Sequence, residues 1–106
     1  MKAITLDEVP AREVFPGFQA RMVHTANMTL AHWSARAGAS VPEHSHPHEQ
    51  VVSVTEGEFE LTVEGEPHRL TPGKLVIVPG NVRHSGRAIT ACRILDVFYP
   101  VREDYR

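Results

Sequence analysis

The chain has 106 residues, of which 42% are hydrophobic and 23% charged, and its formal net charge is −2. This composition is enough for one folded domain with an apolar core, and it excludes an intrinsically disordered chain. The eleven basic residues are scattered along the sequence, which argues against a nucleic-acid-binding protein. No apolar run reaches the ~18 residues of a membrane span. Asp7 interrupts the N-terminal segment before a signal-peptide core could form, and Cys92 has no second cysteine to pair with. We therefore expect a soluble, cytoplasmic protein that binds neither nucleic acid nor membrane.

The first half of the chain contains two predicted strands. Leu6–Phe15 has some helical periodicity, but prolines interrupt it. Met28–Arg36 is the first plausible long strand, with Trp33 as its largest apolar residue. Gln50–Thr55 is rich in valine and is followed by Glu56-Gly57-Glu58. A glycine between polar residues at this point predicts a hairpin turn.

The second half reads as further short strands separated by Gly and Pro turns. Phe59, Leu61 and Val63 alternate with polar residues, which predicts a strand with one buried face. The chain turns at Glu64–Pro67 and returns through His68–Leu70. Leu75–Val78 is continuously apolar, as expected for a strand covered on both faces, and Ile94–Tyr99 is the last strong strand. This spacing predicts an all-β sandwich or barrel in one domain over residues 1–106.

Histidines provide the strongest chemical signal. The chain has seven, and His44, His46 and His48 fall within five positions. Residues i and i+2 of a strand share a face, so His44 and His46 are predicted to project together. His84 follows a turn, where a neighbouring antiparallel strand could bring it opposite them. Three neutral imidazoles would suit a divalent transition metal ion, whereas the alternative is a solvated histidine cluster on a loop.

Two segments carry these histidines with regular spacing. Gly38–Gly57 contains His44, His46 and Gln50, and Gly73–His84 contains Pro79 and Asn81; fifteen residues separate the two segments. Together they resemble the paired motifs of the cupin superfamily. The resemblance implies a jelly-roll β-barrel or sandwich that binds one divalent metal ion (Zn, Ni, Fe, Mn or Cu). The ligands that it implies are His44, His46, Gln50 and His84.

The sequence departs from the general cupin pattern at three positions. Gln50 stands where Glu is usual, Asn81 replaces a Gly, and Ala88 stands where Asn is frequent. A neutral amide leaves the ion its full charge, which favours Lewis-acid chemistry. The missing carboxylate also argues against an oxygenase built on a two-histidine, one-carboxylate triad.

A glutamine at this position and the tail Leu95–Tyr105 are similar to a narrower group, the bacterial pectin-degradation cupins. These proteins linearise unsaturated uronates released by pectin and alginate lyases. The resemblance implies a metal-dependent, non-redox enzyme acting on an anionic sugar acid. It also implies active-site roles for three tail residues: Asp96 as general acid/base, Arg102 as a clamp for the substrate carboxylate, and Phe98 in substrate binding.

Alternatives remain open at the level of the sequence. Asp96 could lie on the outer face of its strand, Phe98 could be a core residue, and Arg102 could be a surface residue. His48 is either near the ligands, facing substrate, or on the surface, and the three other histidines are predicted to be structural: His24, His32 and His68. The rival functions are a metal-dependent dioxygenase and a non-catalytic sugar- or ligand-binding cupin. Exposed sheet edges make a homodimer the expected assembly.

Overall fold

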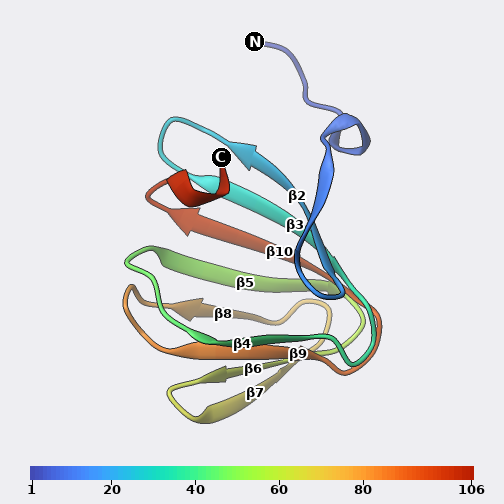
Figure 1. Ribbon diagram of the computed structural model, residues 1–106, viewed down its shortest axis with the longest axis vertical. Helices are drawn as coiled ribbons and strands as arrows, with labels where there is room; N and C mark the ends of the chain where they lie inside the picture. The colour runs from blue at the N-terminus through green and yellow to red at the C-terminus, as the bar shows by residue number, and fades with distance from the viewer.

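The computed structural model describes residues 1–106 as ten strands in two antiparallel sheets (Figure 1). The six-stranded sheet has the order β1-β2-β3-β10-β5-β8 and the four-stranded sheet the order β4-β9-β6-β7. The strands are β1 (Ala11–Phe15), β2 (Phe18–His24), β3 (Thr29–Ala35), β4 (Ser40–His44), β5 (Glu49–Glu56), β6 (Phe59–Val63), β7 (Glu66–Leu70), β8 (Leu75–Val78), β9 (His84–Ala88) and β10 (Cys92–Tyr99). Two short 3-10 helices, η1 (Leu6–Glu8) and η2 (Glu103–Tyr105), are the only helical segments. The predicted all-β jelly-roll class is confirmed.

The core lies between the two sheets. Every second side chain of the central strands points into it, so β10 contributes Ile94 and Phe98 and β6 contributes Phe59 and Leu61. Fifteen buried residues form one continuous cluster. Burial of each large apolar side chain is worth about 1.5–3 kcal/mol. This packing holds the inward faces of β5, β9 and β10 rigidly around the site described below.

The N-terminal region differs from the expectation. The helical periodicity of Leu6–Phe15 is misleading, because only Leu6–Glu8 is helical. Ala11–Phe15 and Phe18–His24 are paired strands that the sequence analysis did not predict. Gly17, with φ of 82°, forms the turn between them. Pairing of β2 with β3 along its whole length overrides the weak local preference.

The predicted hairpin at Gly57 is also wrong, because β5 and β6 belong to different sheets. Gly57 (φ 77°) instead carries the chain from one sheet to the other, and a Cβ there would overlap the carbonyl oxygen of Ala91. The true hairpin follows β6. Glu64 and Gly65, both with positive φ, form its two-residue turn, as expected for strands joined this tightly.

Strand β8 was predicted to be covered on both faces, and this is wrong. It pairs only with β5 and forms an edge of the six-stranded sheet. Leu75 and Ile77 on its outer face are 55% and 59% exposed, whereas Val78 is fully buried. The continuously apolar run of β8 therefore has one face buried in the core and the other exposed to solvent.

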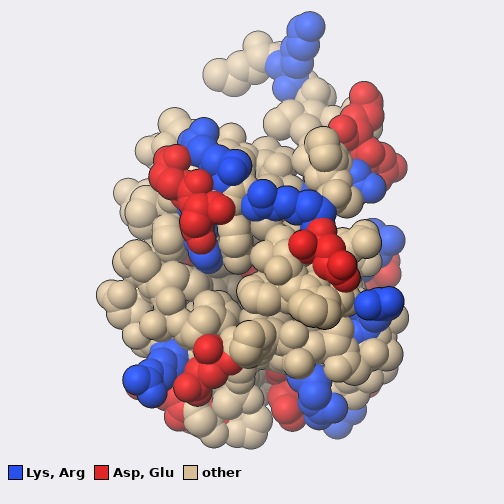
Figure 2. All heavy atoms as spheres, in the orientation of Figure 1, with Lys and Arg blue, Asp and Glu red and all other residues tan.

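The visible surface mixes both signs of charge. Figure 2 shows acidic and basic side chains interspersed over this face, without a large patch of one sign. The structure contains no helix with the length and apolar character needed to cross a membrane.

Candidate metal centre

Three histidines meet between the ends of two strands and a loop. His44 ends β4 and lies in register opposite His84, which begins β9. His46 lies beyond the end of β4, in the connection to β5, so the prediction that it shares a strand face with His44 is wrong. The connection nevertheless folds back, and the potential ligand atoms of the three side chains lie within 4.8 Å of one another.

Backbone carbonyls orient all three rings in the same way. Each Nδ1 faces a carbonyl oxygen two residues away in the chain, and the pairs are His44 with Pro42 at 2.9 Å, His46 with His48 at 3.1 Å, and His84 with Val82 at 2.8 Å. Because Nδ1 donates in each pair, Nε2 carries the lone pair, as in histidines that bind metals. Burial lowers the pKa of His46 to about 4 and also lowers the pKa of His84, so both rings are neutral.

Gln50 joins the cluster from the inward face of β5. Its Oε1 lies 3.0 Å from His46 Nε2, and its Nε2 donates to Asp96 Oδ2 at 2.9 Å. A neutral His46 has a single N–H, which the carbonyl of His48 accepts, so lone pairs face each other between His46 and Gln50. The Nε2 atom of His84 is buried without any partner.

A cation among these atoms would bind the facing lone pairs of His46 and Gln50 and also the Nε2 atom of His84, which otherwise has no partner. Three imidazole nitrogens and one amide oxygen form a donor set suited to Zn²⁺ or another divalent transition ion. The residues present therefore fit such an ion, with His44, His46, Gln50 and His84 as the side chains that would hold it.

Asp96 lies on the inward face of β10, between Ile94 and Phe98, and is 7% exposed. Its Oδ2 accepts hydrogen bonds from the indole Nε1 of Trp33 at 3.0 Å and from Gln50, whereas Oδ1 is buried without a partner. Burial raises the pKa of this carboxyl to about 7, against the opposing influence of these two donors and of Arg102. Near neutral pH the group can therefore either donate or accept a proton.

Arg102 follows β10 and is 6% exposed, so its interpretation as a surface residue is wrong. Its guanidinium carbon lies 4.8 Å from the centre of the Phe98 ring and 4.0 Å from that of Tyr105. Phe98 also contacts His46, with ring centres 5.6 Å apart. Phe98 thus belongs both to the core and to the link between the histidines and Arg102.

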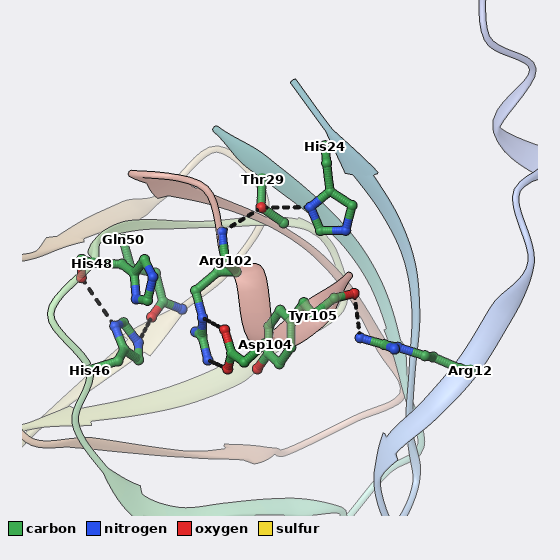
Figure 3. A network of polar contacts seen from close by, with 9 residues as sticks. All are labelled: Arg12, His24, Thr29, His46, His48, Gln50, Arg102, Asp104 and Tyr105. Carbon is green, nitrogen blue, oxygen red and sulfur yellow. Dashed lines mark hydrogen bonds and ion pairs between the residues drawn. The ribbon is translucent and has the colours of Figure 1, made fainter. Parts of the chain in front are cut away.

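His48 is half-buried and stands beside His46, with ring centres 5.5 Å apart. Its carbonyl oxygen orients the His46 ring, as Figure 3 shows, but its own side chain is not part of the three-histidine cluster. Of the other histidines, His24 contacts Thr29, at 2.8 Å between Nδ1 and Oγ1.

Most of the predicted site residues line one cavity, part of which is open to solvent. Six of the seven predicted site residues line it: His44, Gln50, His84, Asp96, Phe98 and Arg102. His46 adjoins the lining through Gln50 and His84. The sequence did not predict that Trp33 and Tyr105 also line it. For Trp33 a signal existed, because a buried indole N–H needs an acceptor.

Comparison with known proteins agrees with this architecture. Residues 31–98 match the model of a family described as the cupin domain. The pectin degradation protein KdgF of Dickeya dadantii is 27% identical over 103 residues, covering 93% of each chain. The structure of KdgF from Halomonas superposes with a TM-score of 0.93 at 29% identity, over 100% of this chain and 99% of that one. An L-ectoine synthase of Streptomyces anulatus is 43% identical, but only over 55% of this chain and 48% of its own. The chain belongs to the cupin family and is similar to KdgF over its whole length.

Proposed function

We propose that the protein linearises unsaturated uronates released from pectin or alginate, opening the sugar ring without a redox step. One observation carries the proposal. Three residues lining the cavity each hold a buried polar atom without a partner: His84 Nε2, Asp96 Oδ1 and Arg102 Nη1. Each such atom costs about 1–3 kcal/mol unless something binds it. A metal ion together with an anionic, hydroxylated ligand would satisfy all three. Similarity to two KdgF proteins over the whole chain supports this choice of ligand.

The roles follow from the chemistry of the side chains. A metal ion held by His44, His46, Gln50 and His84 would supply Lewis-acid polarisation of a substrate oxygen. Arg102 would bind the uronate carboxylate through paired N–H groups. Asp96 Oδ1 would move a proton as one water molecule adds across the enol ether, placing its hydrogen at C4 and its hydroxyl at C5. The resulting hemiketal opens by cleavage of the bond between C5 and the ring oxygen, which leaves a ketone at C5 and the ring oxygen on C1 as an aldehyde hydrate that loses water. Phe98 would pack against the sugar and the guanidinium.

The test is direct conversion of a monomeric unsaturated uronate by metal-loaded protein. Loss of the ultraviolet absorbance of the enol ether, with the 5-keto-4-deoxyuronate identified by NMR, should be faster than the spontaneous reaction. The rate should be equal in air and without oxygen, which separates this proposal from a dioxygenase. A protein that has bound its metal and gives only the spontaneous rate would refute the proposal and leave a ligand-binding cupin.

We also propose that the chain forms a homodimer. The edge strand β8 and its exposed Leu75 and Ile77 support this, because such edges are commonly covered by a partner. Light scattering that gives the monomer mass across the working concentration range would contradict it. Cytoplasmic location stays a prediction.

A further inference from the structure

Arg102 is held from four sides. Its backbone N–H donates to Thr29 Oγ1 at 2.9 Å, and its guanidinium lies against the rings of Phe98 and Tyr105. The fourth contact comes from Asp104 in η2, as Figure 3 shows. In Figure 1 this C-terminal turn lies next to the end of β10, at the same end of the molecule as the connection from β4 to β5.

Asp104 occupies one particular edge of the guanidinium. Arg102 Nε donates to Oδ1 at 3.0 Å and Nη2 donates to Oδ2 at 2.7 Å. These hydrogen bonds also lower the pKa of the Asp104 carboxyl, so it is ionised at neutral pH. A guanidinium has five N–H groups, and Asp104 uses two of them. Three remain, two on Nη1 and one on Nη2. The remaining N–H of Nη2 and the adjacent N–H of Nη1 are parallel and form the end edge of the group, whereas the other N–H of Nη1 points back toward Cδ.

The end edge is the part of Arg102 available to a ligand. Nη1 is buried and has no partner, and Arg102 lines the cavity that also contains His44 and Asp96. The Arg102 side chain is 7% exposed, whereas that of Asp104 is 57% exposed. Asp104 therefore lies on the solvent side of the guanidinium, and the end edge is left for the cavity.

We propose that Asp104 is a positioning residue for the substrate carboxylate: by binding the side edge of Arg102 it presents the end edge to the cavity as a fixed pair of donors. The inference rests on the proposed function, because that function supplies the carboxylate. The ion pair also cancels the charge of Arg102. A carboxylate is then recognised by two parallel N–H groups in a fixed plane, and a ligand that offers only negative charge gains little.

The key variant is Asp104→Asn, with Glu103→Gln as its matched control. Both residues lie in η2 and both changes remove one negative charge, but Glu103 pairs with Arg106 at 3.1 Å and not with Arg102. Asp104 is exposed but the Arg102 guanidinium is buried, so Asp104→Asn should lower the Tm modestly while the protein stays folded at the assay temperature, which thermal unfolding checks. Hydrogen bonds to charged groups are stronger than neutral ones, so losing the paired hydrogen bonds between Arg102 and Asp104 should raise KM about tenfold. Because Asp104 does not touch the reacting atoms, kcat should stay within about twofold, and Asp104→Glu should restore part of the loss.

A second measurement does not depend on turnover. In metal-loaded protein without substrate, the Arg102 Nε–H should exchange slowly with solvent in the wild type and in Glu103→Gln, and much faster in Asp104→Asn. Titration with D-galacturonate, a saturated hexuronate, should shift this signal and give an affinity about tenfold weaker for Asp104→Asn.

The outcomes separate the two proposals. A wild-type protein that binds D-galacturonate without converting unsaturated uronate refutes the function, while the difference in affinity between the variants still supports the positioning role. Equal KM and equal D-galacturonate affinity for Asp104→Asn and Glu103→Gln overturn the positioning role, as does rapid Nε–H exchange in the wild type. Failure of the wild type to bind D-galacturonate at all also overturns it.

Discussion

Replacement of His84 by alanine should weaken metal binding while the fold is retained. The imidazole is 3% exposed, its Nδ1 donates to the Val82 carbonyl, and its Nε2 has no partner. Its ring centre lies 4.3 Å from that of His44 and 4.9 Å from that of His46. His84→Ala therefore removes a ligand from the middle of the cluster, but it removes no strand pairing.

The change has two effects of different size. In metal-free protein, the loss of ring packing is partly offset because a buried nitrogen without a partner, which costs about 1–3 kcal/mol, is removed. We expect a net destabilisation of about 1 kcal/mol. Metal at one hundred times its dissociation constant stabilises the wild type by about 2.7 kcal/mol. For a domain of this size that is a rise in Tm of about 10–20 °C. A hundredfold weaker site keeps only about 0.4 kcal/mol at the same concentration.

Thermal unfolding with and without Zn²⁺, Ni²⁺ and Mn²⁺, together with metal content by mass spectrometry, measures both effects. His68→Ala is the control, because His68 is a half-buried histidine on β7 outside the cluster. It should keep the full rise in Tm. A His84→Ala protein that binds and responds to metal like the wild type would refute the assignment of the ligands. A wholly unfolded metal-free protein would show instead that the metal is structural.

Three further predictions follow from single contacts. Asp96→Asn should retain metal but lower turnover of unsaturated uronate about 100-fold or more, and wild-type turnover would exclude Asp96 as the acid/base. Cys92 is 3% exposed and burial raises the pKa of its thiol to about 11, so thiol reagents should label it only as fast as the protein unfolds. Gly57→Ala should cost more than about 3 kcal/mol by denaturant unfolding, because strain at positive φ adds to an overlap with Ala91. Gly65→Ala has nearly the same φ but open space, so it should cost only about 1–2 kcal/mol; equal costs would contradict the overlap.

The candidate site was predictable where its pattern is local. The positions of the histidines drew attention to His44, His46 and His84, the resemblance to the cupin motifs added Gln50, and the structure brings their polar atoms together. The alternation of β10 placed Ile94, Asp96 and Phe98 on one face, and all three are buried. Such inferences succeed because the period of a strand is a property of the backbone itself. The roles of these residues in metal binding and catalysis stay predictions.

The surroundings of those residues depended on contacts between distant parts of the chain. Trp33 donates to Asp96 across 63 positions, and Arg102 donates to Thr29 across 73. Neither Trp33 nor Thr29 lies in a recognisable sequence motif, because a hydrogen bond of this kind needs only a polar atom at the right place in space. The edge position of β8 also depends on the order of all the strands in the sheet, whereas the two missed N-terminal strands pair with their neighbours in sequence and were missed because their local pattern is weak.

The sequence by itself determined the all-β class, the spacing of the ligand motifs and which side chains of β10 share a face, since each depends on spacing within a segment. Only the tertiary structure decided that the chain changes sheet at Gly57 and that His46 joins the other two histidines from a loop. It also decided that Asp104 binds one edge of the Arg102 guanidinium. Those features depend on which strands pair and in which register. Register is decided by the burial of whole faces at once, and no short segment contains that information.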